Sequence, residues 1–279
     1  RIRNTARFLL GNLKDFDPGK DGVPFTKMPE LERWILSRLQ ALIRKATRGY
    51  DEFEFHVPAY MIHHFCVNEL SAIYLDVRKD RLYAEDRAGE ARRSCQTALW
   101  AILRALTEML APVLSFTSEE VWQEMRGLDP SIPESVFLSH WPRVDETLID
   151  QELDIRWERI LEQRGAQSRA LEAARTNGVI GHSLDAQVEV LLGETSEDPA
   201  GLLSEEEWAT LSIVSSLHFV RTFGDGGFSW KDPVTGMEFN IRKAPGGKCP
   251  RCWRRAPEVP ERGVCDRCRG VLERMNGSI

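Results

Sequence analysis

Hydrophobic side chains recur every three or four residues over most of the first 127 positions, which is the spacing of helices that bury one face. One stripe consists of Ile2, Ala6, Leu9, Leu10 and Leu13, and a second of Leu31, Trp34, Ile35, Leu39, Leu42, Ile43 and Ala46. Further helices are predicted over 57–80 and 90–111, the latter ending at Pro112. A capping box of Thr117 and Glu120 predicts the start of a short helix. Residues 1–127 are therefore predicted to form a helical bundle.

The pattern changes after residue 127. Three prolines and little periodicity indicate a loop packed over the bundle, or a linker, up to about residue 148. A long helix is predicted from Gln151 to the pair Asn177-Gly178. Alternation over 186–192 predicts a strand, Ser204 with Glu207 predicts a capped short helix, and 213–220 and 237–241 predict further strands. We expect a mainly α protein with a helical domain at 1–148, an α+β domain at 149–243 and a small terminal domain at 244–279.

The terminal segment contains two C-x2-C pairs separated by twelve residues, namely Cys249, Cys252, Cys265 and Cys268. A two-residue gap lets both thiolates of a tight turn reach one ion, and two such turns complete the tetrahedron that zinc accepts. Four thiolates leave no position open for water or substrate, so the sequence predicts one structural zinc ion in a zinc ribbon. The segment has few apolar residues of its own, so the metal must supply most of its folding free energy.

Other uses of these cysteines fit less well. Two disulfides require an oxidising compartment, and a redox-active C-x2-C usually stands alone at a strand-to-helix junction. Cys66 and Cys95 each lie on an apolar helix without a partner at ligand spacing, so we interpret them as buried small hydrophobes. His63 and His64 are adjacent and point about 100° apart on a helix. We interpret all six histidines as structural or surface residues.

The composition indicates a soluble protein, with 42% hydrophobic and 29% charged residues. No segment approaches the roughly 20 apolar residues of a membrane span, and the first residues lack a secretory cleavage site. We therefore expect a cytoplasmic protein with no membrane partner, and we expect it to be a monomer. The chain begins with Arg1 instead of methionine, so we expect it to be a piece of a larger protein.

The net charge of −6 discourages a nucleic-acid function, but the charge is uneven along the chain. Residues 241–279 contain ten Lys or Arg and four Asp or Glu, a balance of +6 that leaves −12 for residues 1–240. Candidate RNA contacts near the first cysteine pair are Arg251, Trp253, Arg254 and Arg255, where guanidinium groups suit phosphates and the indole suits an unpaired base. Trp253 is equally well explained as the core of the ribbon.

Two basic stripes on the predicted helices are weaker candidates. At 100° per residue, Arg3, Arg7 and Lys14 fall within about 40° on the first helix, and Arg33, Arg44 and Arg48 within about 60° on the second. Helices of any bundle carry Lys and Arg on the solvent face, so both interpretations stay open.

Four segments together resemble the isoleucyl-tRNA synthetases of the bacterial type. They are RIRNTARFLLGNLKDF at 1–16, FCVNELSAIYLDVRKDRLY at 65–83, RRSCQTALWAILRALTEMLAPVLSFTSEEVW at 92–122 and KCPRCWRR at 248–255. The resemblance implies the part after the catalytic domain: a helical anticodon-binding domain, a junction domain and a zinc-binding domain similar to the zinc finger of formamidopyrimidine-DNA glycosylase. No HIGH-like or KMSKS-like motif, Gly-rich ATP-binding loop or editing domain is found, so the chain alone is not expected to be catalytic.

The resemblance implies a tRNA-binding portion of an isoleucine–tRNA ligase, which positions tRNA(Ile) for ATP-dependent aminoacylation by a catalytic domain outside this chain. Its implied partners are tRNA(Ile) and the catalytic and editing domains of the same polypeptide. Two alternatives belong to other classes. A DNA-repair glycosylase matches only the ribbon, and its amino-terminal proline followed by an acid is replaced by Arg1-Ile2. A zinc-stabilised protein-interaction module is favoured by the acidic first 240 residues.

Overall fold

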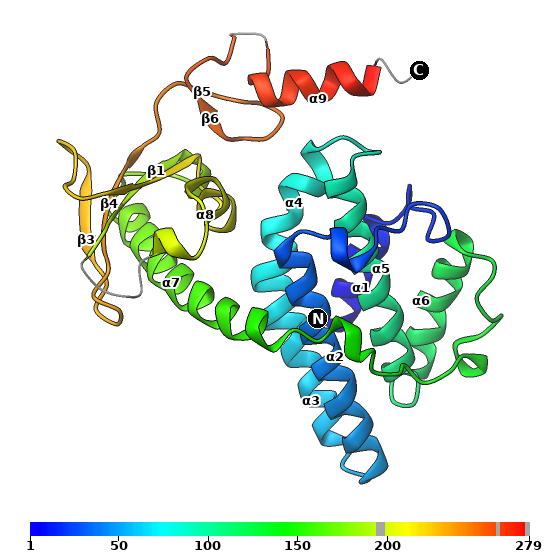
Figure 1. Ribbon diagram of the computed structural model, residues 1–279. Helices are drawn as coiled ribbons and strands as arrows, with labels where there is room; N and C mark the ends of the chain where they lie inside the picture. Colours follow the sequence, from blue (N-terminus) through cyan, green and yellow to red (C-terminus); the bar gives the residue numbers. More distant parts are fainter. Residues whose placement is uncertain (194–198, 261–262, 277–279) are drawn as a thin grey trace. The chain divides into compact units, whose positions relative to one another are not determined.

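The computed structural model describes residues 1–193, 199–260 and 263–276, and the chain divides into two compact units, Arg1–Asp154 and Ile155–Ile279. The first unit is helical, and the second combines helices, a small sheet and a short terminal ribbon (Figure 1). This confirms the predicted mainly α fold with a small α+β part. No helix in the described part of the chain is both long and apolar enough to cross a membrane.

The helices of the first unit surround α5. They are α1 (Ile2–Gly11), α2 (Glu30–Asp51), α3 (His56–His64), α4 (Leu75–Ala84), α5 (Glu90–Leu110) and α6 (Ser115–Leu128). Helix α5 contacts α1, α2, α4 and α6, and its Leu99 and Ile102 are fully buried. The stripes read from the sequence, such as Leu9 and Leu13 or Ile35 and Leu39, face this core. Burial of these side chains is the main driving force for the bundle.

A π-helical segment, Phe65–Tyr74, joins α3 to α4 into one continuous helical path that is longer than the predicted 57–80. The backbone N–H of Leu75, at the end of this segment, donates to the Leu70 carbonyl, five residues earlier. A wider turn with bonds five residues apart is the geometry that distinguishes a π-helix from an α-helix. The apolar pattern predicts the helical path but carries no signal for this change of hydrogen bonding.

Two local predictions for the first unit were wrong. Helix α6 begins at Ser115, two residues before the predicted capping box, and its N-cap Leu114 makes no side-chain hydrogen bond. Glu120 pairs with Arg3 at 2.7 Å, so its carboxylate does not cap the helix. Helix α1 ends at Gly11, so Lys14 lies in the turn that follows the helix and not on its face.

The segment after α6 is a loop packed on the bundle, one of the two interpretations that the sequence left open. It contains short 3-10 turns at Val136–Leu138 and Glu146–Leu148. The indole Nε1 of Trp141 donates to the Thr47 hydroxyl at 2.8 Å, and the backbone N–H of Asp145 donates to Gln40 Oε1 at 2.9 Å. These bonds fix the loop against α2.

A buried ion pair crosses the core of the first unit. Arg78 donates to Glu32 at 2.5 Å, and neither side chain is more than 4% exposed. Burial alone would lower the pKa of Arg78, but the Glu32 carboxylate beside it raises that pKa above its ordinary value. Removal of either partner would leave the other charge buried without a counter-charge, which would destabilise the fold.

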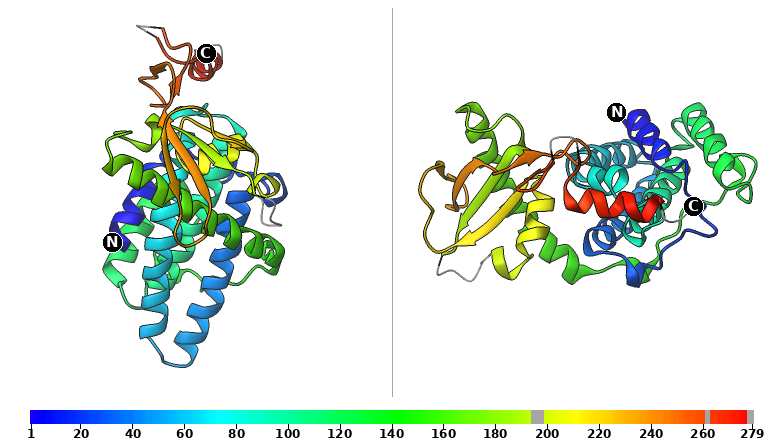
Figure 2. Two further views of the ribbon diagram at one scale, coloured as in Figure 1. Left: turned by 90° about the vertical axis from the view of Figure 1, so that its left-hand side faces the viewer. Right: turned by 90° about the horizontal axis from the view of Figure 1, so that it is seen from above.

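The second unit begins in α7 (Gln151–Thr176) and continues into a small sheet, which Figure 2 shows from two further sides. The strand order of this sheet is β2-β1-β4-β3. Its strands are β1 (Ala186–Leu191), β2 (Ser216–Val220), β3 (Phe228–Lys231) and β4 (Glu238–Lys243). β1 pairs with β2 in parallel, whereas β4 is antiparallel to both β1 and β3. Gly178, at φ +71°, follows the end of α7, as the predicted Asn-Gly terminus requires.

Helix α8 (Glu205–Leu211) lies between β1 and β2 in the sequence, and it carries the predicted capping box of Ser204 and Glu207. Strand β2 starts three residues later than predicted, after Ile213 adopts a left-handed φ of +56°. Strand β3 was missed, because only four residues separate the preceding glycines from the next turn. After β4 the chain forms β5 (Gly247–Lys248), β6 (Arg255–Ala256) and α9 (Asp266–Asn276).

Candidate metal centre and nucleic-acid interface

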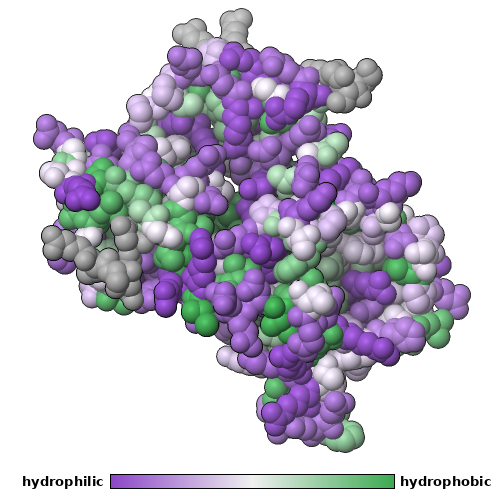
Figure 3. Space-filling model, in the orientation of Figure 1, coloured by the Kyte–Doolittle hydropathy of each residue, from purple (hydrophilic) through white to green (hydrophobic). Residues whose placement is uncertain are grey.

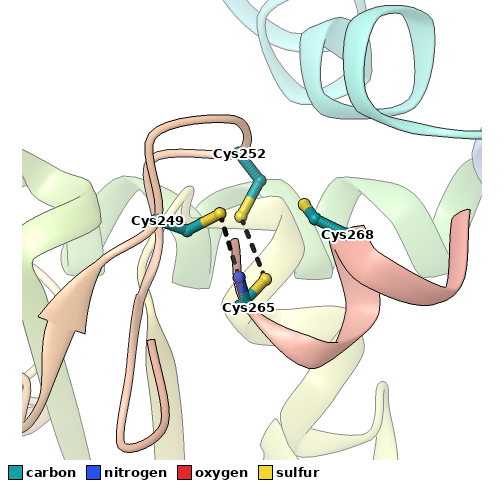
Figure 4. A group of neighbouring side chains, drawn as sticks. All are labelled: Cys249, Cys252, Cys265 and Cys268. Carbon is teal, nitrogen blue, oxygen red and sulfur yellow. Dashed lines mark hydrogen bonds between the residues drawn. The ribbon is translucent and has the colours of Figure 1, made fainter. Parts of the chain in front are cut away.

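The four predicted cysteine ligands meet in the ribbon (Figure 4). Cys249 and Cys252 lie on the turn between β5 and β6, Cys265 directly precedes α9, and Cys268 is in the first turn of that helix. Their sulfur atoms all lie within 4.8 Å of one another, and all four residues are buried. The Sγ atoms of Cys252 and Cys265 are 3.7 Å apart. A zinc ion with Zn–S bonds of about 2.3 Å would separate its sulfurs by about 3.8 Å, so this arrangement fits a tetrahedral metal ion.

The electrostatics of the cluster also favour a cation. Burial raises the pKa of Cys249, but backbone N–H groups of Cys252, Cys265 and Arg251 outweigh this and lower it to about 6. One of these, the N–H of Cys265, lies 3.4 Å from the Cys249 sulfur. Burial raises the pKa of Cys252 and of Cys268, and the neighbouring Cys265 thiol adds to the rise at both. A divalent cation would stabilise four thiolates that otherwise repel one another.

The ribbon has little else to hold it together. On the face shown in Figure 3 its surface, at the top of the view, is mostly hydrophilic. Apart from the four cysteines, Ala244 and Val271 are its buried hydrophobic residues among those described. Gly246 takes a φ of +83°, and a Cβ atom there would lie 2.0 Å from the carbonyl oxygen of Ala256. A glycine is therefore required where β5 and β6 approach each other.

Trp253 projects from the metal-binding turn. Its side chain is 57% exposed, so it does not form the core of the ribbon. Its backbone has a φ of +66°, a left-handed conformation that is unfavourable for a bulky residue. The Nζ of Lys248 lies 5.9 Å from the centre of the indole ring. Lys248 was not among the residues singled out from the sequence, although it stands directly before Cys249.

The three arginines predicted near the first cysteine pair all contact protein groups. Arg251 donates a side-chain hydrogen bond that lowers the pKa of Cys268, against the larger effect of burial. Arg254 donates to the Thr210 hydroxyl at 3.2 Å. The side chain of Arg255 is 17% exposed and pairs with Asp185 at 3.4 Å.

The basic residues of the helical unit fall into two groups. Arg3, Arg7 and Lys14 line one groove of about 480 Å³ between α1 and α6, together with Thr117, Glu120 and Glu124. The structure thus brings the first predicted stripe together even though Lys14 lies beyond the helix. On α2, Arg44 pairs with Glu146 at 2.7 Å, Arg48 pairs with Glu52 at 2.8 Å, and Arg33 is half-buried.

Both remaining cysteines and two of the six histidines have structural surroundings. Cys66 and Cys95 are fully buried, as predicted, and burial raises the pKa of the Cys66 thiol to about 11 and that of Cys95 to about 12. His182 caps a 3-10 turn, and His218 lies 3.2 Å from Glu205. Within the described ranges, the four ribbon cysteines form the one cluster of metal-binding side chains.

Comparison with known proteins identifies the family. Residues 32–190 match the family described as the anticodon-binding domain of tRNA ligase, which is more than half of the chain. This chain belongs to that family. Over 99% of its length it is also 43% identical to the isoleucine–tRNA ligase of Moorella thermoacetica and 44% identical to that of Natranaerobius thermophilus. The isoleucine–tRNA ligase of Aquifex aeolicus is 42% identical over a similar range.

The chain spans about 30% of the length of these curated relatives. The similarity to isoleucine–tRNA ligases covers 99% of this chain and so includes the ribbon, which lies outside the family match at 32–190. These comparisons confirm the resemblance to isoleucyl-tRNA synthetases that the sequence segments indicated.

Proposed function

We propose that this chain is the tRNA-binding portion of an isoleucine–tRNA ligase and that it positions tRNA(Ile) by its anticodon side for ATP-dependent aminoacylation. The observation that supports this most strongly is the anticodon-binding family match within a chain that aligns along its length with isoleucine–tRNA ligases. Holding a large substrate in one orientation removes much of the entropic barrier to a reaction at its distant end. The catalytic and editing domains of the parent polypeptide would be its partners, and we expect a cytoplasmic monomer.

We propose that the four cysteines hold one structural zinc ion. All four ligands are cysteine sulfurs, and the distances between these sulfurs suit a closed tetrahedral site. Soft thiolate ligands select zinc over magnesium or calcium. When bound, zinc would supply folding free energy, since no ligand position is left for substrate. Within the ribbon, the residues that act on RNA are therefore those around the metal and not its ligands.

We propose Trp253 as a base-stacking residue and Lys248 as the cation beside it. An exposed indole offers a flat surface on which an unpaired anticodon base can stack. Lys248, exposed and close to that ring, is placed to meet the phosphate of the same nucleotide. Phe53 shares the exposed aromatic ring and the positive φ, so the basic surroundings of Trp253, and not its backbone conformation, support this proposal.

The predicted arginines complete the proposal. Arg251 lies on the same turn as Trp253, and Arg3, Arg7 and Lys14 share the groove beside α6. Arg33, Arg44 and Arg48 would add a weaker electrostatic contribution from α2, because Arg44 and Arg48 already pair with carboxylates.

Filter binding tests this function. The chain should bind isoleucine tRNA more tightly than the same tRNA carrying a swapped anticodon, and equal binding of both would overturn anticodon-side recognition. Trp253→Gly relieves the backbone strain while it removes the stacking surface, so it should retain the metal and lose about 1–3 kcal/mol of tRNA binding. The matched control is Phe53→Gly, which removes another exposed aromatic at a positive φ of +58° among the acidic residues Asp51, Glu52 and Glu54.

Lys248→Ala tests the phosphate contact separately. Loss of one phosphate contact should lower the slope of log affinity against log salt by about 0.7–0.9 and weaken all tRNAs alike. An unchanged slope would remove Lys248 from the interface.

A further inference from the structure

Arg255 connects the metal-binding turn to the sheet of the second unit. Its backbone N–H donates to the Ser215 hydroxyl at 2.8 Å, and that hydroxyl donates to the Leu184 carbonyl at 2.5 Å. Its guanidinium donates to the Gly246 carbonyl at 2.6 Å and pairs with Asp185 at 3.4 Å. One arginine thus contacts both the base of the ribbon and the segment that precedes β1.

Asp185 is itself fixed in place. Its carboxylate accepts the backbone N–H of His182 at 3.2 Å and completes the capping box of the 3-10 turn Ser183–Asp185. Its carbonyl accepts the N–H of Ala244 at 2.7 Å, at the point where the chain leaves β4 for the ribbon. The Arg255 and Asp185 side chains are 17% and 19% exposed, so solvent screens this pair less than a surface salt bridge.

Arg254 makes a second connection. Its carbonyl accepts the N–H of Cys249 at 2.9 Å and closes the metal-binding turn. Its guanidinium reaches Thr210, near the end of α8. The backbone of this residue therefore belongs to the metal site while its side chain is held by the α+β part of the unit.

Polar contacts, and not apolar packing, set the orientation of the turn. A cavity of about 440 Å³ lies at this junction and is lined by Ser215, Arg254 and Arg255 on one side and by the ligands Cys252 and Cys265 on the other. An unfilled junction cannot fix an orientation by close packing. The hydrogen bond from the Arg254 side chain, the hydrogen bond from the Arg255 backbone and the Arg255–Asp185 ion pair can do so.

We propose that Arg254 and Arg255 are positioning residues that hold the metal-binding turn on the sheet so that the neighbouring Trp253 meets an anticodon base. This inference rests on the proposed tRNA-binding function and replaces the phosphate role expected for these two arginines. A stacking residue that is displaced by about 1 Å can lose most of its effect, because productive contacts depend on geometry. Arg255 acts through Trp253 and needs no contact with RNA.

The substitution Arg255→Ala separates positioning from phosphate binding. We expect zinc content to stay near one per chain, since all four ligands remain, while affinity for isoleucine tRNA falls about tenfold with an unchanged salt slope. A slope that falls by about 0.7–0.9 would show a phosphate contact and overturn the proposal. The matched control is Arg269→Ala, which removes an exposed arginine of α9 paired with Asp266 at 2.5 Å and should leave affinity within twofold.

A double-mutant cycle tests whether Arg255 acts through Trp253. Trp253→Gly should weaken tRNA binding strongly in the unsubstituted chain and only slightly in the Arg255→Ala background, because the indole is already misplaced there. Asp185→Asn should reproduce Arg255→Ala and add nothing to it. Fully additive effects would mean a merely structural role and overturn the proposal. If the unsubstituted chain binds no tRNA, the proposed function itself fails, which the cycle distinguishes from failure of the positioning role alone.

Discussion

Loss of one cysteine ligand should unfold the ribbon and leave the helical unit intact. Cys265→Ser replaces a thiolate by a hydroxyl that binds zinc poorly, so the remaining three ligands should release the metal. Cys265 also donates its backbone N–H to the Cys249 sulfur, so it contributes to the site through its backbone as well as its thiolate. The first unit buries its own core around α5 and does not depend on the site.

The size of the effect follows from what the ribbon buries. Apart from its cysteines, its described buried hydrophobic residues are Ala244 and Val271, and burial of these contributes about 2–4 kcal/mol. A structural zinc ion contributes about 10–16 kcal/mol of apparent binding free energy in small zinc domains. The metal term is several times larger, so the ribbon should be folded only when metal is bound.

Element analysis and circular dichroism together measure this prediction. The unsubstituted chain should contain about one zinc, Cys265→Ser should contain almost none, and the loss of helix should not exceed the 11 residues of α9. The control is Cys66→Ser, which places a hydroxyl in the helical core and should destabilise the bundle while zinc is retained. Full zinc content in Cys265→Ser would show that Cys265 is not a ligand, and loss of helix throughout the chain would show that the helical unit depends on the metal.

Three further predictions concern stability and activity. Glu32→Gln should destabilise the helical unit by about 3–5 kcal/mol in urea denaturation, because Arg78 keeps a buried charge without a counter-charge. Arg169 holds the pKa of Asp232 well below its usual range, so the resulting stability should be present above about pH 4 and lost as the pH falls further. Asp232→Asn should cost about 1.5–3 kcal/mol at pH 7 and flatten this acid dependence. Isoleucine-dependent pyrophosphate exchange by this chain should stay at background, because its sequence has no ATP-binding motif. Exchange above a heat-killed control would show that the chain contains an ATP-binding site.

The features that the sequence predicted well depend on local chemistry. The apolar stripes predict helices because a period of 3.6 places Leu9 and Leu13, or Ile35 and Leu39, on one face. The C-x2-C pairs predict a cluster of thiols, because a gap of two residues places both cysteines of a pair on one tight turn. The capping box at Ser204 was confirmed for the same reason, since its two partners are three residues apart.

The features that the sequence missed depend on contacts between distant residues. Thr117 and Glu120 have capping-box spacing, but Arg3, 117 residues away, takes the Glu120 carboxylate. Arg255 has the sequence context of a phosphate ligand, and only the folded chain brings Asp185 to it. Lys248 is a candidate for RNA binding because its Nζ lies close to the indole of Trp253, and nothing in the sequence around it predicts this contact. Spacing along the chain describes what a residue can do, and tertiary contacts decide which of these options it uses.

Metal binding would offset the backbone strain at the exposed Trp253. A left-handed backbone costs a bulky residue about 1–2 kcal/mol, and Trp253 recovers little of this inside the fold because more than half of its surface faces solvent. Glycine at this position would make the ribbon easier to fold. Binding of the proposed zinc ion would contribute about 10–16 kcal/mol, which exceeds this cost many times, so the site could tolerate a residue whose favourable contacts lie outside the chain. A partner that stacks on the indole would offset this cost, and Trp253→Gly should make the metal-bound ribbon more stable while it weakens tRNA binding.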